Sequence, residues 1–202
     1  MIDQDDSAMS NTQASNYAQI FSPDHYICGW NHGSTGSYAA GYYNNDEIKS
    51  RTIEKIRQLH EGCDNLEAFQ IFHSISGGTG SGLTALMKSE LSEQYPETLL
   101  ANHVILPYET WPGGTMEAYN AVLAMHSLTE YSNLTFLYNN EALSNLCQTS
   151  PTYNITQPSF CELNSIIAQQ ATNLTASFRF LGHLNSTYRK IATNLIPFPR
   201  LS

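Results

Sequence analysis

One short stretch of this sequence combines residue types that can bind an anion. Residues 75–83 read Ile-Ser-Gly-Gly-Thr-Gly-Ser-Gly-Leu and join a predicted strand to a predicted helix. Glycines let the backbone turn sharply and bring its N–H groups close to a ligand, while the helix adds the positive end of its dipole. The hydroxyls of Thr79 and Ser81 offer two more donors, so the stretch predicts phosphate binding without a lysine. The predicted phosphate-binding residues are Ser76, Gly77, Gly78, Thr79, Gly80 and Ser81.

Two common phosphate loops differ from this stretch. A Walker loop requires Gly-Lys-Ser/Thr at its end, whereas Gly82 is followed by Leu83 and Thr84. A dinucleotide-binding loop requires G-x-G-x-x-G, and residues 78–82 are one residue short of that pattern. An NAD-linked oxidoreductase is therefore disfavoured. A flexible glycine loop that binds no ligand remains the alternative.

The elements that must position this loop alternate along the chain. Residues up to about Gln19 are polar and unperiodic, so a loop or frayed terminus is expected there. Strand-like runs occur at 68–74, 103–106 and 134–138. Between and after them, apolar spacing predicts helices over 46–59, 83–94, 116–128, 141–146, 160–173 and 184–195. Such alternation predicts an α/β fold, a parallel sheet flanked by helices.

One of these helices is predicted to carry three apolar residues on one face. In the helix over 116–128, Ala118, Val122 and Met125 are expected to share one face. The helix over 46–59 places four apolar residues at helical spacing, with Asn45 or Asp46 as its cap.

Composition excludes several classes of protein. The 202 residues include 9 basic and 18 acidic side chains, a net charge of −9. No nucleic-acid partner is expected, because phosphate backbones are bound by clustered Lys and Arg. No membrane partner is expected either, since no apolar run approaches the ~20 residues that cross a bilayer. The four cysteines form no CxxC pair, so no zinc site is indicated, and a reduced, cytosolic protein is expected.

Several segments in order resemble the tubulin family. Residues 76–82 resemble the tubulin signature loop, with Ser76 at the place of its first glycine, and Ser81 favours the eukaryotic branch over the bacterial one. The resemblance runs from about Asp3 to Leu201 and identifies the chain as a member of this family. The other similar segments are residues 19–24, 41–43, 117–120, 139–143 and 196–201.

The resemblance implies a Rossmann-like GTPase domain that is incomplete at both ends. The family's first strand and its glutamine-bearing phosphate loop would precede Met1, and further domains would follow Ser202. On this basis residues 1–180 are expected to form part of the nucleotide-binding domain. Residues 181–202 are expected to start the intermediate domain.

The resemblance also implies a function, that of a GTP-binding structural subunit of cytoplasmic microtubules. Such a subunit would bind GTP or GDP with Mg²⁺, pair with an α-type tubulin and polymerise head to tail. No catalytic residue is expected within this chain, because the neighbouring subunit would donate the acidic residue that hydrolyses GTP in the polymer. Residues 197–201 and Lys190 resemble β-tubulin, and Lys190 would lie at the inter-subunit contact. The alternative is a divergent or truncated tubulin that lacks hydrolysis and acts only in assembly.

Individual nucleotide contacts follow from the same resemblance. Glu117 matches the residue that hydrogen-bonds the ribose. Asn140 and Asn164 match two asparagines that read the guanine edge, and an amide suits a purine because it offers both a donor and an acceptor. Phe160 stands where the family often has a tyrosine stacked on the base.

The residues expected near the γ-phosphate depart from the family pattern. Asp3 and Asp5 match two acidic residues near Mg²⁺, which prefers such hard oxygen ligands, and Asp5 is the expected metal residue. Gly36 and Ser37 occupy a position where tubulins usually carry Asn-Asn, and Gly113 replaces an acidic residue of the sugar loop. These departures predict a weakened affinity for GTP.

Overall fold

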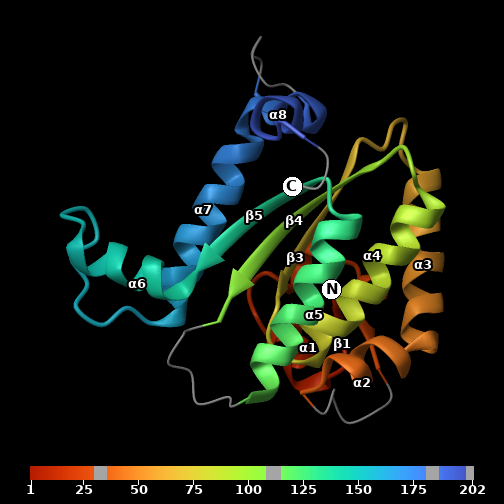
Figure 1. Cartoon of the computed structure of the whole chain (residues 1–202), viewed down its shortest axis with the longest axis horizontal. Helices are drawn as coiled ribbons and strands as arrows, with labels where there is room; N and C mark the ends of the chain where they lie inside the picture. Colours follow the sequence, from red (N-terminus) through yellow and green to blue (C-terminus); the bar gives the residue numbers. More distant parts are fainter. Residues whose placement is uncertain (30–35, 108–114, 181–186, 199–202) are drawn as a thin grey trace. The chain divides into compact units, whose positions relative to one another are not determined.

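A computed structural model describes residues 1–29, 36–107, 115–180 and 187–198 (Figure 1). They form two compact units, and each is considered by itself. Of the helices in the described ranges, none has the length and apolar character needed to cross a bilayer. The first unit comprises residues 1–66, 75–98 and 113–131, and the second comprises residues 67–74, 99–112 and 132–202.

The second unit is built on a parallel sheet. β3 (Ala68–Ser74), β4 (Leu99–Leu106) and β5 (Leu134–Asn139) lie side by side in that order (Figure 1). Leu100 and Val104 of the central strand are buried, and six of the strand's eight residues are apolar, as is usual in a parallel sheet. Because parallel neighbours need a crossover connection, the expected α/β class is confirmed.

Helices α7 (Phe160–Arg179) and α8 (Tyr188–Leu195) supply the apolar side chains that cover this sheet. Tyr188 and Ile191 of α8 are buried against Ala101 of β4. Leu174 and Phe178 join the same cluster, so α7 continues beyond its predicted end at residue 173. α8 begins after Thr187, whose side chain accepts a hydrogen bond from the backbone N–H of Lys190; its predicted start at Leu184 lies outside the described residues.

The core of the first unit lies between two helices and a short strand pair. β1 (Ile2–Asp3) runs parallel to β2 (Ile27–Cys28). Helices α3 (Asp46–Glu61) and α4 (Thr84–Gln94) pack together and enclose the apolar cluster with these strands. Its buried members are Ile27, Ile48, Leu83, Leu86 and Met87.

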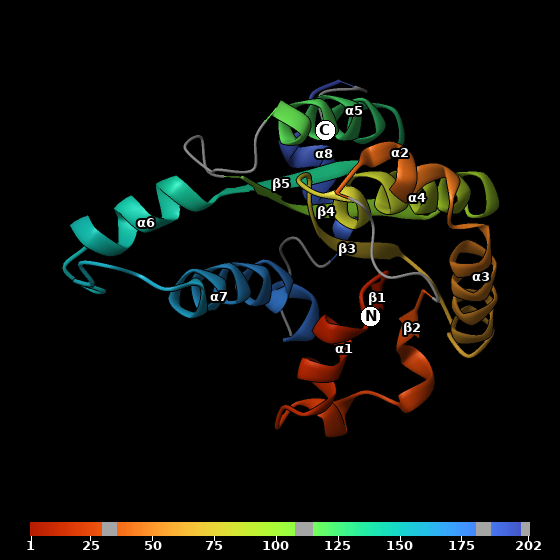
Figure 2. The same ribbon diagram turned by 90° about the horizontal axis from the view of Figure 1, so that it is seen from below.

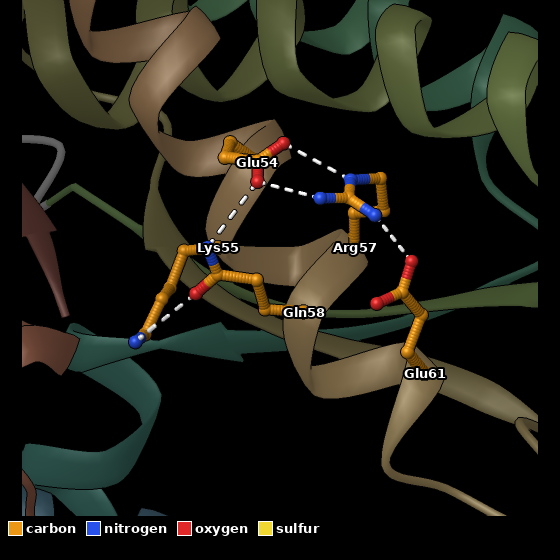
Figure 3. Close-up of polar contacts among 5 residues, drawn as sticks. All are labelled: Glu54, Lys55, Arg57, Gln58 and Glu61. Carbon is orange, nitrogen blue, oxygen red and sulfur yellow. Dashed lines mark hydrogen bonds and ion pairs between the residues drawn. The ribbon is translucent and has the colours of Figure 1, made fainter.

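The outward face of α3 is charged and exposed (Figure 3). Arg57 donates to both carboxylate oxygens of Glu54, at 3.0 and 2.7 Å, and also to Glu61. Gln58 and Lys55 extend the same row of polar contacts. These pairs stand three and four residues apart, where helical side chains meet, and exposed pairs of this kind add little to stability.

The N-terminal segment contains helix α1 (Asp6–Gln13), so the loop expected up to Gln19 was wrong for these residues. Asp5 caps the helix, and its carboxylate accepts a hydrogen bond from the backbone N–H of Ser7 at 3.0 Å. Met9 is buried and anchors the helix. Met9 is the one buried apolar residue among the described side chains of α1, which leaves too little periodicity to detect in the sequence.

Helix α5 (Thr115–Tyr131) leaves its predicted apolar face exposed. Ala118, Val122 and Met125 are exposed, Val122 by 70 %. Standing four and three residues apart, they share one face of the helix as expected, but that face is exposed because α5 is apolar around most of its circumference and apolar spacing did not indicate which side is buried. The buried residues are instead Asn120, Ala124, Ser127 and Leu128.

Candidate nucleotide-binding site

The predicted phosphate loop leads into α4 through one π turn, Thr79–Leu83. Gly77, just before the turn, has a φ of +75°, a left-handed conformation that glycine adopts without strain. A π turn widens a helix locally, and such turns are frequent at functional sites. The loop therefore has the form of a bent backbone at the start of a helix, where N–H groups lack carbonyl partners within the helix.

Side chains within and beside the loop hold this bend. Ser81 is almost fully buried and its hydroxyl donates to the carbonyl of Gly77. The hydroxyl of Thr84 donates to the carbonyl of Thr79 at 3.3 Å, and that of Thr79 donates to Oε1 of Gln4 at 3.1 Å. The sequence predicts that the Thr79 and Ser81 hydroxyls donate to phosphate, and in the structure Thr79 donates to Gln4 and Ser81 to Gly77. Both hydroxyls therefore contribute to the shape of the loop.

Gln4 connects the acidic N-terminal segment to the loop. It is only 6 % exposed and reaches Thr79. On either side of it stand Asp3 and Asp5, and the carboxylate of Asp3 accepts from the backbone N–H of Asp5 at 3.3 Å. Hydrogen bonds from Ser7, first from its backbone N–H and then from its hydroxyl, hold the pKa of Asp5 below the usual value. The segment near the loop therefore carries two carboxylates, the ligand type that Mg²⁺ prefers.

No larger metal cluster accompanies these two residues. Across the described ranges, no three His, Cys, Asp or Glu side chains gather where they could hold an ion together. Asp5 is exposed, and its two oxygens already accept from Ser7.

Helix α2 (Tyr38–Tyr43) lies against the loop (Figure 2). Gly41 of the helix and Gly82 of the π turn approach each other backbone to backbone. The phenol of Tyr38 stacks on Tyr42 with ring centroids 5.8 Å apart, and burial raises the pKa of Tyr38. The loop and α2 thus form one packed element.

The segment in front of α2 is held by Asn120 of α5. Its Oδ1 accepts from the backbone N–H of Tyr38 at 2.8 Å, and its Nδ2 donates to the carbonyl of Gly36 at 2.7 Å. Glu117, half-buried in the first turn of α5, stands three residues before Asn120 and so on the same side of the helix. Within the first unit, α2 therefore contacts both the loop and α5, the helix that carries Glu117, and it directly follows Gly36 and Ser37.

The three predicted base-binding residues belong to the second unit. Asn140 begins α6 (Asn140–Thr149) directly after β5, where Asn139 caps the helix by accepting from the backbone N–H of Glu141 at 2.8 Å. Phe160 and Asn164 are one turn apart on the exposed side of α7, and Phe160 is 55 % exposed. All three residues therefore lie near the N-terminal ends of α6 and α7.

These two helices pack against each other (Figure 1). The apolar residues that join them include Cys147 of α6 and Leu163 and Ile166 of α7, all buried. At the start of α7, Ser159 and Glu162 form a capping box, in which Glu162 accepts from the backbone N–H of Ser159 at 2.8 Å. Packing and cap together fix where the helix begins.

Lys190 lies on the exposed side of α8. Its neighbours Tyr188 and Ile191 are buried, so the sheet-facing side of the helix is occupied by other residues. The side chain of Lys190 is accordingly accessible to a partner.

Two residues of the site were missed by the sequence analysis. Gln4 and Asn120 are polar, and nothing in their local pattern distinguishes them from surface side chains. The signal available for Asn120 was its place in the segment 117–120 that resembles tubulin. Gly113, expected in the sugar loop, lies outside the described residues.

The loop, the helix that follows it and the acidic N-terminal segment have counterparts among known proteins. Residues 1–148 match the sequence profile described as Tubulin/FtsZ family, GTPase domain. The chain belongs to the tubulin family. The fold of a tubulin GTPase domain, expected from the sequence, is thereby confirmed.

Three curated relatives within the tubulin family are β chains. The tubulin beta chain of Candida albicans is 39% identical over 203 residues, covering 100% of this chain and 44% of the relative. That of Saccharomyces cerevisiae is 42% identical over 184 residues, covering 90% and 39% respectively. That of Trichophyton rubrum is 37% identical over 202 residues, covering 100% and 44%. The chain therefore spans less than half the length of these relatives.

Proposed function

We propose that this chain binds GTP and GDP and holds their phosphates on residues Ser76–Ser81. The observation that carries this proposal is the glycine bend whose hydroxyls brace the loop and whose backbone amides begin a helix. Backbone N–H groups and the helix dipole attract an anion without any lysine. The family supports the choice of a guanine nucleotide, since its matched domain is a GTPase domain.

The base and sugar contacts complete this proposal. Asn140 and Asn164 read the guanine edge, Phe160 stacks on the ring and Glu117 accepts from a ribose hydroxyl. Asp3 and Asp5 contact Mg²⁺ through water or directly, since the pKa of Asp5 is lowered and its carboxylate is ionised at neutral pH.

Nucleotide binding is tested by titration calorimetry with GTP, GDP and ATP. The wild-type protein is expected to bind GTP at least tenfold more tightly than ATP. Replacing Asn140 or Asn164 by Ala should weaken GTP binding about tenfold and narrow that preference, because each amide supplies about one polar contact. Matched controls are Asn145→Ala on α6 and Asn173→Ala on α7, both exposed, which should leave binding unchanged. Absence of GTP binding at micromolar concentrations would refute the proposal.

The three relatives are named tubulin beta chains, which supports a role in a polymer. We infer that the protein containing this chain pairs with an α-type tubulin in cytoplasmic microtubules, with residues 1–180 in the nucleotide-binding domain and 181–202 starting the next. Lys190 then lies at the inter-subunit contact, and GTP is hydrolysed only in the polymer. Lys190→Glu should lower co-sedimentation with microtubules, whereas Lys55→Glu on α3 should leave it unchanged.

A second candidate, a tubulin that has lost hydrolysis, is favoured by one observation. Gly36 and Ser37 carry no side-chain amide where the family usually has two, and Ser37 makes no capping hydrogen bond to α2. The double variant Gly36→Asn, Ser37→Asn tests it, since asparagine tolerates the φ of +71° at position 36. An increase in polymer-dependent GTP hydrolysis favours this candidate, and an unchanged rate argues against it.

A further inference from the structure

The amide of Asn120 is a buried clamp on the segment that precedes α2. The side chain is 2 % exposed, and both of its polar atoms hydrogen-bond backbone groups more than 80 positions away. Its orientation is set by its partners, because the N–H of Tyr38 can only donate and the carbonyl of Gly36 can only accept. The two contacts, at 2.8 and 2.7 Å, have the length of good hydrogen bonds.

Among the described residues, neither Gly36 nor Ser37 caps α2 with a side chain. Gly36 is exposed, with a φ of +71° and no atom within 4 Å of where a Cβ would stand. Ser37 is the N-cap of α2 but its side chain makes no capping bond. In the described part of the chain, Asn120 is the side chain that hydrogen-bonds the backbone on both sides of Ser37.

Asn120 also stands beside the proposed sugar contact. Glu117 precedes it by three residues on α5, so both side chains leave the same side of the helix. One rigid turn of α5 thereby connects Glu117 to the segment of Gly36 and Ser37. The backbone hydrogen bonds of the helix keep the spacing between Glu117 and Asn120 fixed.

We propose that Asn120 is the positioning residue through which the site distinguishes GTP from GDP. It holds Gly36, Ser37 and Tyr38 in the conformation that meets the third phosphate, and α5 keeps that segment at a fixed distance from the ribose contact. This inference rests on the proposed nucleotide function and adds the group that sets the position of its γ-phosphate contact.

Comparing the affinities for GTP and GDP distinguishes this positioning role from a merely structural one. The two nucleotides share the base, the ribose and two phosphates, so a loss of general stability weakens both to a similar extent. A residue that acts only on the segment of Gly36 and Ser37 weakens GTP and spares GDP.

The experiment compares Asn120→Ser and Asn120→Asp with wild type by titration calorimetry in Mg²⁺, using GTP and GDP. The serine is too short to reach both partners, and the aspartate turns an oxygen toward the carbonyl of Gly36 in place of the donor. Affinity for GTP should fall about tenfold and affinity for GDP less than twofold, as expected for one or two lost hydrogen bonds. Asn45→Asp is the matched control, because Asn45 is equally buried and clamps the other end of α2 through the carbonyls of Ala40 and Gly41. It should leave the ratio of GTP to GDP affinity unchanged.

The outcomes are distinguishable. If wild type binds neither nucleotide, the proposed function fails. If wild type binds both and the Asn120 variants weaken them equally, or not at all, the role of Asn120 is overturned. If neither variant folds, Gly36→Ala is tested instead. An alanine there is strained by the φ of +71°, and its Cβ would meet no atom within 4 Å. A selective loss of GTP affinity in that variant supports the proposal, and an equal loss or no loss overturns it.

Discussion

Gly41 of α2 lies so close to Gly78 of the loop that no side chain fits between them. A Cβ added at Gly41 would stand 2.0 Å from the carbonyl oxygen of Gly78. The loop and the helix are equally close at a second point, since a Cβ added at Gly82 would stand 2.1 Å from the carbonyl oxygen of Tyr38. The shape of the proposed phosphate loop therefore depends on a helix that is more than 35 positions away in the sequence.

Alanine at either position is expected to be strongly destabilising. Gly41→Ala and Gly82→Ala force two backbones apart, and overpacking of this kind costs about 1–3 kcal/mol or more. Thermal unfolding followed by circular dichroism measures the loss. Gly62→Ala is the control, because its nearest neighbour, the carbonyl oxygen of Leu59, is 3.5 Å away. Equal melting temperatures for Gly41→Ala and Gly62→Ala would show that the close contact does not exist in solution.

Lys88 of α4 is expected to destabilise the protein at neutral pH. It is 0 % exposed, its Nζ has no hydrogen-bond partner among the described residues, and burial lowers its pKa to about 7. Its pKa in the unfolded chain is higher, about 10.4, so the unfolded state binds more protons between these values and stability rises with pH across that window. Lys88→Met should raise the free energy of unfolding at pH 7 by about 1–3 kcal/mol.

Urea unfolding at pH 7 and pH 9.5 checks this prediction. The gain from Lys88→Met should shrink at the higher pH, because wild-type stability rises there by up to about 1.4 kcal/mol per pH unit. Lys49→Met is the control, since Lys49 is partly exposed and pairs with Glu90 at 3.5 Å. A gain from Lys88→Met that is the same at both pH values would contradict the assigned cause.

His103 of β4 is expected to make the second unit sensitive to acid. Its ring stacks on Phe72 at 4.2 Å and on Phe136 at 4.9 Å, and its Nδ1 lies 2.9 Å from the hydroxyl of Tyr138. Burial lowers its pKa to about 4. The unfolded chain, with a histidine pKa of about 6.5, therefore binds more protons between these values, and stability falls as the pH drops through that range.

His103→Phe removes the titrating group and keeps an aromatic ring in the stack. The difference in unfolding free energy between variant and wild type should grow by about 1.4 kcal/mol for each pH unit from 6.5 down to 4. Denaturant unfolding at pH 5 and pH 7.5 measures it. A constant difference for His103→Phe would rule out a buried neutral imidazole.

The start of α7 is expected to depend on its cap. Ser159→Ala removes the side chain that accepts from the backbone N–H of Cys161 at 3.3 Å and that bonds Glu162. The loss should be about 1 kcal/mol, typical of a serine N-cap. Ser165→Ala, exposed in the middle of the same helix, should change stability by less than about 0.5 kcal/mol. Chemical denaturation compares the two, and equal effects would mean that the cap is not formed.

Element type was predictable where a strong local pattern existed. The strand at 68–74 was predicted within its observed bounds, because alternating and apolar residues there are closed by glycines. β4 begins at Leu99, four residues before its predicted start. The prediction started too late because the polar Asn102 interrupts the apolar run. In the structure Asn102 is buried within the strand and donates a hydrogen bond to Ser132 at 2.7 Å. The buried face of α5 could not be predicted, because apolar residues are spread around most of this helix and only tertiary packing determines which of them are covered.

The residues by themselves determined the glycine loop, its place between a strand and a helix, and the family to which the chain belongs. These follow from local chemistry, because glycine content, spacing and order are properties of the chain before it folds. Tertiary structure decided which polar groups serve the site: the hydroxyls of Thr79 and Ser81 brace the loop, Gln4 reaches the loop from the N-terminal segment, and Asn120 holds the segment before α2. Long-range hydrogen bonds leave no periodic trace in a sequence, since nothing but the packed fold brings their partners within hydrogen-bonding distance.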